Sequence, residues 1–283
     1  MGPLSFVLLR MSKIYIIGGA GFIGQHLRGA LVKEFNRDSV VVVDPLGRGP
    51  VVVDSYELNS IVVYLASVSQ HRQTTESAVS DLSNLDKAFI MAKQSKSTLL
   101  IASTSSVSGG NTAHACYAKW AEILASHYRG VVRSHFLRFY SVYGEGQHDN
   151  LVRRAIYAAV ADTDLTVCGS HYIRDWIHVS DAVDYVVQVL NVCVGRKSLP
   201  PVLHVGTGRG LPVSVVLETI ENMLDKNIKM ITGPNPVNEP VVSVAQKILQ
   251  GWSAKITLEQ GILQTYHSYL HNGQHQGTEE TSE

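Results

Sequence analysis

The sequence predicts an α/β fold, a parallel sheet with helices on both faces, and three observations support this prediction. Short apolar runs alternate with amphipathic helical patterns along most of the chain. The first run, 14–17, breaks into three glycines spaced three residues apart. A run of four valines, 40–43, then ends at Asp44, about twenty residues after the glycines, which is the spacing of a dinucleotide-binding unit.

The glycine turn contains the residues that a dinucleotide-binding loop needs. Gly18 permits a tight turn after the buried strand, and Gly21 lets the backbone approach a pyrophosphate. Gly24 lets the following helix pack close to the strand. That helix starts at Phe22 and Ile23, and it offers its N-terminal amides and positive dipole end to the phosphates.

The acidic residue after the second strand indicates which cofactor is bound. Asp44 can bind both ribose hydroxyls and repels a 2′-phosphate. Arg48 lies a few residues later and could compensate, but the acid favours NAD over NADP. We therefore expect NAD as the cofactor.

The other elements follow from the same patterns. Further strands are expected at 40–43, 51–53, 61–65, 99–103, 134–138 and 202–205, and helices at 22–33, 81–93, 117–128, 150–161, 214–224 and 242–249. Few residues separate 43 from 51 and 54 from 61, whereas a parallel crossover needs about a dozen or more. We therefore expect the sheet edge near residues 44–61 to be trimmed.

Length and composition fit one nucleotide-binding domain with a small second lobe. The chain has 283 residues, with 24 basic and 24 acidic side chains, so its charge points to neither nucleic acid nor a membrane surface. No apolar run is long enough to span a bilayer, and three scattered cysteines show no metal-ligand or redox spacing. We expect a cytoplasmic protein without a metal site.

The expected organisation is an N-terminal extension (1–11), an NAD-binding domain (12–144, with contributions from about 165–206), a substrate lobe (mainly 145–270) and a disordered tail (271–283).

Seven short motifs occur in a fixed order along the chain. They are Gly-Gly-Ala-Gly-Phe-Ile-Gly at 18–24, Val-Asp at 53–54, Val-Tyr-Leu-Ala-Ser at 63–67, Ser-Thr-Ser-Ser-Val-Ser-Gly at 103–109, Leu-Arg-Phe-Tyr-Ser-Val-Tyr-Gly at 137–144, Arg-Asp-Trp-Ile-His-Val-Ser-Asp at 174–181 and His-Val-Gly-Thr-Gly at 204–208. In these motifs the chain resembles the extended short-chain dehydrogenase/reductase family, specifically its NAD-dependent nucleotide-sugar epimerases and dehydratases. The resemblance covers nearly the whole chain and implies a Rossmann-like fold with a small C-terminal substrate lobe.

On the cofactor side, the resemblance assigns roles to residues that follow successive strands. Asp54 stands where an acid binds the adenine amino group, and Leu65 and Ala66 stand where the family lines the cofactor. Thr104 stands where a hydroxyl hydrogen-bonds the sugar oxygen that is oxidised, with ordinary strand-end capping as the alternative. Residues 105–106 are both serine where the dehydratases carry an Asp-Glu pair, which disfavours 4,6-dehydration because the proton carriers are missing.

The Tyr-x-x-x-Lys motif of the family is altered. Lys119 is present, but the residue four before it is Ala115, and Tyr117 is only two positions away, on a different side of a helix. The resemblance implies that Lys119 holds the ribose and supplies positive charge. Three interpretations of the base stay open: Tyr117 acts from a non-helical first turn, His114 substitutes for it, or the base is absent.

On the substrate side, Arg174 precedes an apolar, strand-like run and has the guanidinium fork that suits a nucleotide diphosphate. The resemblance gives Arg174 this role. Ser141 and Asn150 are expected to contact the sugar nucleotide, and Arg209 and Gln147 are further candidates for phosphate or sugar contacts.

Together these features predict an NAD-dependent enzyme that acts on a nucleotide-diphosphate sugar. The simplest reaction is 4-epimerisation, in which C4 is transiently oxidised to a keto-sugar and the hydride returns to the other face. Thr104, Tyr117 and Lys119 are the expected catalytic residues. Two alternatives are a catalytically impaired homologue that binds NAD and nucleotide sugar, and a nucleotide-sugar 4-ketoreductase, against which Asp44 argues. The resemblance also implies a homodimer formed through the helical segments 81–93 and 117–128.

Overall fold

The chain divides into two compact units, each made from three segments. The computed structural model describes residues 13–43, 53–67, 74–110, 112–147, 149–234 and 240–276, with side chains up to residue 271. Unit 1 comprises Met1–Phe139, Val183–Val205 and Lys247–Trp252, and unit 2 comprises Tyr140–Ala182, Gly206–Gln246 and Ser253–Glu283. In the described part of the chain, no helix is both long and apolar enough to cross a bilayer.

Unit 1 is built on a six-stranded parallel sheet in the order β2-β1-β3-β4-β5-β9. Its strands are β1 (Ile14–Ile17), β2 (Val40–Val43), β3 (Ile61–Tyr64), β4 (Thr98–Thr104), β5 (Ser134–Phe139) and β9 (Val202–Val205). Strands β1 and β3 are buried along their whole length, as their continuous apolar runs require when helices cover both faces of a parallel sheet. The predicted α/β fold is confirmed.

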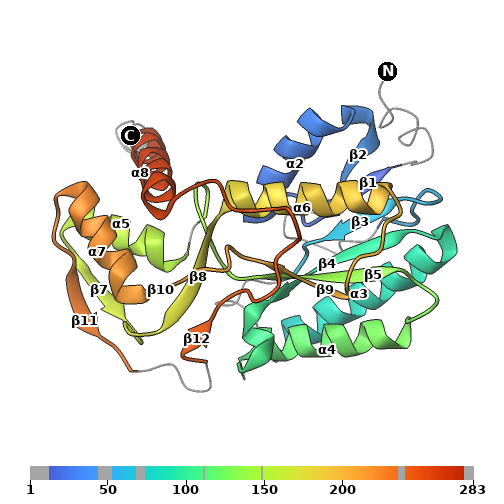
Figure 1. Ribbon diagram of the computed structural model, residues 1–283, viewed down its shortest axis with the longest axis horizontal. Coiled ribbons are helices and arrows are strands. Elements are labelled where there is room, and N and C mark those ends of the chain that lie inside the picture. The colour runs from blue at the N-terminus through green and yellow to red at the C-terminus, as the bar shows by residue number, and fades with distance from the viewer. Residues whose placement is uncertain are drawn as a thin grey trace, which may run out of the picture. The chain divides into compact units, whose positions relative to one another are not determined.

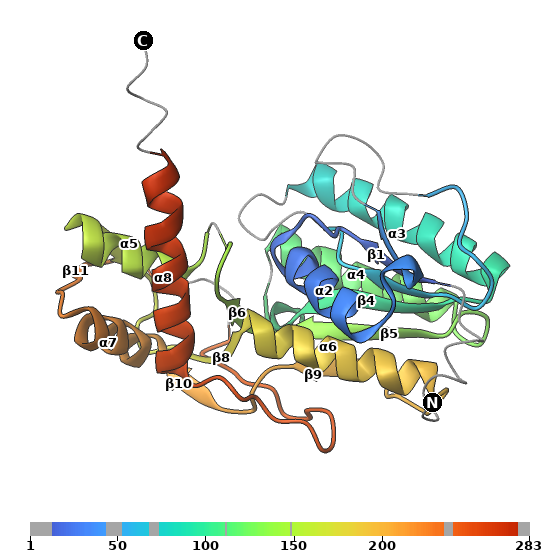
Figure 2. The same cartoon turned by 90° about the horizontal axis from the view of Figure 1, so that it is seen from above.

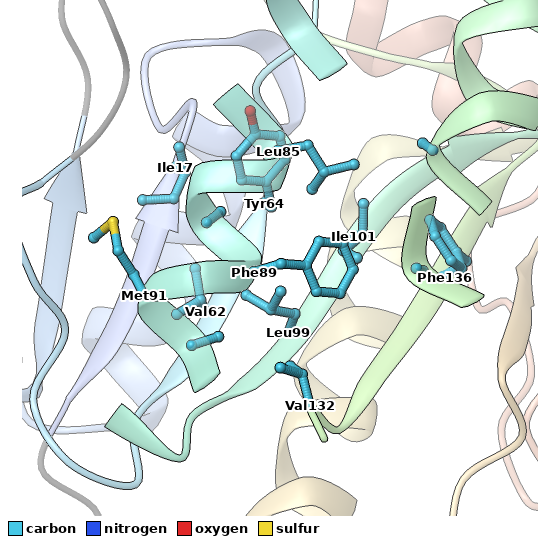
Figure 3. Close-up of a cluster of buried hydrophobic side chains, with 14 of the residues drawn as sticks. Ile17, Val62, Tyr64, Leu85, Phe89, Met91, Leu99, Ile101, Val132 and Phe136 are labelled. Carbon is cyan, nitrogen blue, oxygen red and sulfur yellow. The ribbon is translucent and has the colours of Figure 1, made fainter. Parts of the chain in front are cut away.

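Helices flank this sheet on both faces. They are α2 (Phe22–Glu34), α3 (Thr75–Ser95), α4 (Ala113–His127) and the part of α6 (Val179–Val194) that belongs to unit 1. Figure 1 shows α2 and α6 on one face of the sheet and α3 and α4 on the other, and Figure 2 shows the same elements from above. Figure 3 shows the core beneath α3, where Leu85 and Phe89 pack against Val62, Leu99 and Ile101.

The sheet edge next to β1 ends at β2. The common doubly wound order places one more strand outside this position, and none is present among the residues that the structure describes. Residues 53–60 form turns and bends instead of a crossover helix. The expected strand 51–53 falls mostly outside the described residues, and Val53 itself is not in a strand. The short connection between β2 and β3 therefore explains why the sheet is trimmed at this edge.

The described residues of unit 2 form short strands, the first turn of α6, and the helices α5 (Leu151–Ala161), α7 (Val213–Leu224) and α8 (Leu258–Gln276). Strand β8 (Ile173–His178) pairs in parallel with β6 (Ser141–Tyr143) and β12 (Val242–Ser243), and antiparallel with β10 (Gly210–Pro212). A separate parallel pair joins β7 (Asp164–Val167) to β11 (Lys229–Thr232). The core of this unit contains Ile156, Val216 and Ile262, one residue from each helix.

Two expectations for the C-terminal part differ from the structure. The expected helix 242–249 is wrong: Val242 and Ser243 form β12, because their pairing with Ile173 and Arg174 of β8 overrides a weak local helical pattern. Helix α8 extends to Gln276, so the first part of the expected disordered tail 271–283 is helical. Residues 277–283 and the expected extension 1–11 lie outside the described residues.

Strand β5 carries a buried histidine, which we expect to make the stability of unit 1 depend on pH. His135 is 6% exposed, and its Nδ1 lies 2.8 Å from the carbonyl oxygen of Pro200. Burial lowers the pKa of His135 below its ordinary value; the Pro200 hydrogen bond opposes this shift and the charge of Arg133 adds to it. Because the folded state resists protonation more than the unfolded state does, this contribution to stability is present above pH ~6.5 and is lost as the pH falls through the lowered pKa.

We therefore expect the free energy of unfolding to decrease between pH ~7 and pH ~5, and a His135→Gln variant to show a shallower decrease over the same range. Urea unfolding at several pH values measures both slopes. His267→Gln, on the exposed surface of α8, controls for the removal of a histidine as such. A His135→Gln slope equal to that of the parent protein would show that this histidine does not cause the acid sensitivity.

Candidate cofactor and substrate sites

The turn between β1 and α2 closes tightly against the residues that follow β3. Gly18 has a φ of +86°, and a Cβ on it would lie 2.9 Å from the backbone N of Ala66. A Cβ on Gly24 would lie 2.3 Å from the carbonyl oxygen of Gly18. Leu65 N donates to the carbonyl oxygen of Ile17 at 2.8 Å. The structure therefore brings the predicted cofactor residues Gly18, Gly24, Leu65 and Ala66 together, and this close approach requires both glycines.

The first turn of α2 provides the amides expected to face an anion. Gly21 is the N-cap and has no side chain to accept their hydrogen bonds, and the first turn holds no acidic residue. Phe22 and Ile23 begin the helix and are half-buried. A helix N-terminus that is not capped by its own side chains carries a positive partial charge, which a pyrophosphate would complement.

The two predicted acidic ligands are placed differently. Asp44 lies outside the described residues, so its role toward the ribose stays a prediction. Asp54 is exposed, in the bend that leads to Tyr56. Tyr56 packs on Tyr15 of β1 with ring centroids 5.0 Å apart, which fixes this segment on the sheet next to Asp54. The adenine contact of Asp54 also stays a prediction.

Thr104 ends β4 and also caps the short 3₁₀ helix η2 (Ser105–Ser108). Its Oγ1 accepts a hydrogen bond from Ser106 N at 3.2 Å. The capping function considered as an alternative is therefore present. Since Oγ1 is the acceptor in this bond, capping does not use the hydroxyl hydrogen, and a role toward a sugar oxygen stays a compatible prediction.

Helix α4 starts earlier than its apolar pattern indicated. Its first residue is Ala113, because the side chain of Thr112 accepts a hydrogen bond from Ala115 N and caps the helix. Tyr117 therefore lies inside the helix and not in a non-helical first turn. His114 lies in the first turn of α4 and is half-buried.

The loop before α4 packs on Ala115, which lies one helical turn before Lys119. Ala115 is fully buried, and a Cβ on Gly110 would lie 3.0 Å from the Cβ of Ala115. Lys119 Nζ donates to the carbonyl oxygen of Gly110 at 2.8 Å. The loop thus covers the place from which a tyrosine at position 115 would extend, and it also holds the Lys119 ammonium.

Tyr117 belongs to the hydrophobic core of unit 1. It is 2% exposed and lies in the same cluster as Tyr64 and Leu85. Burial, and secondarily the charge of Asp81, raise the pKa of Tyr117 above its ordinary value of 10. A general base that works near neutral pH needs the opposite shift. This packing weighs against Tyr117 as the base, and its catalytic role stays a prediction.

Arg174 is fixed against the backbone of its own unit. Its Nη1 donates to the carbonyl oxygens of Ile173 and Pro240 at 3.1 Å and of Val241 at 3.2 Å. The guanidinium carbon lies 5.0 Å from the centroid of the Tyr172 ring. These contacts orient the guanidinium plane, and the diphosphate contact of Arg174 stays a prediction.

The other predicted substrate residues of unit 2 lie at the starts of two elements. Ser141 begins β6 and pairs with Trp176, two positions along β8 from Arg174. Asn150 is the N-cap of α5: its Oδ1 accepts a hydrogen bond from Arg153 N at 2.8 Å, and its Nδ2 donates to Gln147 Oε1. The structure therefore brings Asn150 and Gln147 together. For Asn150, helix capping already explains the residue type.

Asp175 directly follows Arg174 and was not among the predicted site residues. This carboxylate is fully buried and accepts hydrogen bonds from Thr207 N at 2.8 Å, Thr207 Oγ1 at 2.7 Å, Gly208 N at 2.9 Å and Ala245 N at 3.1 Å. It therefore joins three separate parts of unit 2. The sequence signal for Asp175 was an acid between an arginine and an apolar run. Its hydrogen-bond partners could not be predicted, because they lie more than thirty residues away in the sequence.

Unit 2 also contains a cavity of about 370 Å³, and Thr207, which donates to Asp175, lies in its wall. Arg209, proposed from the sequence as a phosphate or sugar contact, lines it together with Trp176. The rest of its wall comes from the segment that leads into α8, over residues 253–259, and from Thr207 and Leu211. Arg209 is therefore far from Asn150 and Gln147 in the sequence, and it lines a cavity whose wall contains neither of these residues.

Comparison with known proteins places the chain in a family. A UDP-N-acetyl-alpha-D-glucosaminuronate decarboxylase of Bacillus cytotoxicus is 24% identical over 89% of this chain and 96% of its own length. A match to a GDP-L-fucose synthase relative of Arabidopsis thaliana is 28% identical but spans only 45% of this chain and 42% of that protein.

Among solved structures, the UDP-glucose 4-epimerase of Thermotoga maritima with UDP-glucose has a TM-score of 0.76 at 18% identity, covering 92% of this chain and 99% of that one. MoeE5 in complex with UDP-glucuronic acid and NAD has a TM-score of 0.76 at 22% identity, with the same coverage. Residues 14–199 match the model of the NAD dependent epimerase/dehydratase family, and the chain belongs to this family.

Proposed function

We propose that this protein is an NAD-dependent enzyme that interconverts the C4 epimers of a nucleotide-diphosphate sugar. The observation that carries the proposal is the glycine turn, in which Gly18 and Gly24 leave no room for a Cβ beside an α2 N-terminus that carries no side-chain cap. This arrangement suits a dinucleotide pyrophosphate, and the chain's membership of an NAD-dependent family supports it.

Several of the predicted residues have roles in this proposal. When bound, NAD would accept a hydride from C4 of the sugar and return it to the opposite face, while a base takes and returns the proton of the C4 hydroxyl; His114 and Tyr117 of α4 are the candidates for this base. The first-turn amides of α2 would bind the pyrophosphate, and Lys119 would exchange its Gly110 contact for the nicotinamide ribose. The Thr104 hydroxyl would hold the sugar oxygen, and the Arg174 guanidinium would bind the diphosphate.

Epimerisation is favoured over other reactions of the family by the residues after β4. Ser105 and Ser106 of η2 cannot carry the protons that elimination of water requires, because neither hydroxyl ionises near neutral pH. UDP-glucose and UDP-glucuronic acid 4-epimerases are among the proteins of similar fold, and decarboxylases are among the sequence relatives. The sugar panel used to test the proposal therefore includes glucuronates.

The test is incubation of the purified protein with NAD and a panel of UDP-, dTDP-, GDP- and CDP-sugars, with products separated by stereoisomer. We expect conversion of one sugar into its 4-epimer, and loss of about a hundredfold or more in rate in Lys119→Ala. Tyr117→Phe is expected to retain most of the activity, because Tyr117 is packed in the core. A hundredfold loss in Tyr117→Phe without a change in stability would instead identify Tyr117 as the base.

A second candidate function is binding of NAD and nucleotide sugar without turnover. The closed position at Ala115 and the core packing of Tyr117 favour it, since neither residue presents a tyrosinate one turn before Lys119. Under this candidate, calorimetry detects binding of both NAD and a UDP-sugar while the whole panel remains unconverted. Release of carbon dioxide from a UDP-glucuronate would contradict both candidates and indicate a decarboxylase.

We also propose a homodimer formed through α3 and α4. Both helices carry exposed apolar side chains: Val79 and Ile90 on α3, and Trp120 and Ile123 on α4. Ile123 is 66% exposed, so a change there leaves the core intact. Light scattering is expected to give twice the chain mass for the parent protein and a single chain mass for Ile123→Glu. An unchanged mass in Ile123→Glu, or a monomeric parent protein, would contradict this interface.

A further inference from the structure

A partly buried ion pair joins α4 to the carboxyl end of the sheet in unit 1. Arg138 of β5 donates from Nε to Glu122 Oε1 at 2.9 Å and from Nη2 to Glu122 Oε2 at 2.6 Å. Ser103 Oγ of β4 donates to the same Oε1 at 3.1 Å. Each charged side chain is 19% exposed. Glu122 is thus held by three directed hydrogen bonds from two neighbouring strands.

The chain positions of these residues link the ion pair to the proposed catalytic groups. Ser103 directly precedes Thr104, and Glu122 lies one helical turn after Lys119, on the same side of α4. Ser103 and Arg138 are register partners in the sheet, and His204 of β9 is the next partner in the same row. The three bonds therefore fix the turn of α4 that carries Lys119 against the strand end that carries Thr104.

Fold stability alone does not account for this arrangement. A partly buried ion pair loses hydration energy on folding that its attraction only partly offsets, so an apolar pair of similar volume would stabilise the contact equally well. A bidentate pair differs from apolar packing in its directionality, because it fixes both the distance and the rotation of the two elements. A residue such as Lys119, whose ammonium must meet a ligand at a defined point, depends on that rotation.

We propose that Glu122 and Arg138 are positioning residues that set Lys119 relative to Thr104 for NAD and sugar. The proposal rests on the proposed function for the roles of Lys119 and Thr104. Neither Glu122 nor Arg138 needs to contact a ligand; each acts through the helix and strand that it joins. The pair is therefore expected to affect the rate and NAD affinity more than the affinity for the nucleotide sugar.

The test compares Glu122→Gln and Arg138→Lys with the parent protein. Glutamine keeps the shape of Glu122 without its charge, and lysine keeps the charge of Arg138 without its planar fork. We expect each variant to lower kcat by about tenfold to a hundredfold and to weaken NAD binding several-fold, with KM for the sugar nucleotide nearly unchanged. Asp162→Asn, which breaks the exposed Lys229–Asp162 pair in unit 2, is the matched control and should match the parent protein.

All measurements are made at a temperature where thermal unfolding shows each variant to be folded. If Glu122→Gln does not fold, Ser103→Ala replaces it, because this change removes one hydrogen bond to Glu122 and leaves the ion pair in place. Variants that fold with lowered thermal stability but retain the parent kcat and NAD affinity would overturn the proposal and leave a purely structural role.

Failure of the proposed function gives a different pattern. If the parent protein converts no sugar, NAD affinity is the remaining readout, and Lys119→Ala sets its scale. Weaker NAD binding in both Lys119→Ala and Glu122→Gln would support the positioning role although catalysis is absent. Weaker binding in Lys119→Ala alone would overturn it.

Discussion

Gly24→Ala is expected to abolish NAD binding, whereas Gly29→Ala, five residues further along the same helix, is expected to stabilise the protein. A Cβ at position 24 would lie 2.3 Å from the carbonyl oxygen of Gly18 and 2.7 Å from Gly19 Cα, so the glycine turn would have to move away from α2. These contacts are with backbone atoms, which cannot rotate away as a flexible side chain can. We expect a loss of about 1–3 kcal/mol in stability and of about a hundredfold or more in NAD affinity.

Gly29 provides the matched control for this prediction. A Cβ at position 29 would meet no atom within 4 Å, so alanine there acts only through helix propensity. The expected gain is about 0.5–1 kcal/mol with unchanged NAD affinity. Thermal unfolding with and without NAD measures both variants. A Gly24→Ala protein that is still stabilised by NAD as strongly as its parent would show that the turn does not hold the pyrophosphate.

Asp175→Ala is expected to cause the largest loss of stability in unit 2, about 3–5 kcal/mol. The change would leave the amides of Thr207, Gly208 and Ala245, of which that of Ala245 is buried, without the acceptor that they share. The adjacent Arg174 should then lose its defined orientation, because the 240–245 segment is held at one end by Asp175 and at the other by Arg174. Urea unfolding measures the stability, and calorimetry with a UDP-sugar measures the effect on binding.

Asp175→Asn separates charge from shape in the same experiment. The asparagine amide group would face amide donors on one side, so we expect roughly half of the loss seen for alanine. Asp162→Ala, an exposed acid paired with Lys229, should change stability by less than about 1 kcal/mol. An Asp175→Ala loss as small as this control would mean that water replaces the carboxylate at the three amides.

The parts of the fold that were predictable are those fixed by local chemistry. The glycine turn, the first strand and α2 follow from residues 14–34 alone, because a buried strand, a turn with positive φ and an amphipathic helix each have their own pattern. The start of α4 was also predictable, since Thr112 is a typical N-cap. The predicted helix nevertheless began at Tyr117, because the apolar pattern starts there. Tyr117 was assigned to catalysis because it lies close to Lys119 in an altered Tyr-x-x-x-Lys motif, and only the structure shows that it packs in the core.

Contacts between distant residues could not be predicted. The Val242–Ser243 strand depends on the edge that β8 offers, and Asp175 depends on donors from two separate segments, at 207–208 and at residue 245. Glu122 was visible as an acid after Lys119, but only the sheet order places Arg138 and Ser103 opposite it. Predicted cofactor residues within one loop could therefore be proposed from the sequence, whereas the groups proposed to orient Lys119, and those that contact Arg174, could not.

The segmented composition of unit 1 has a consequence for synthesis of the protein in the cell. Strand β9 completes the sheet by pairing Phe136 with Val202, and the last segment of this unit ends at Trp252, which donates to Asp184 of α6 at 2.7 Å. At ~5–20 residues per second, the ribosome adds these parts seconds after β5 has emerged. Until then the open side of β5 is an unpaired edge that a neighbouring nascent chain or a chaperone can reach. A gene fragment that stops after β5 would keep that edge permanently, so the cofactor-binding unit is not expected to fold from a contiguous N-terminal piece.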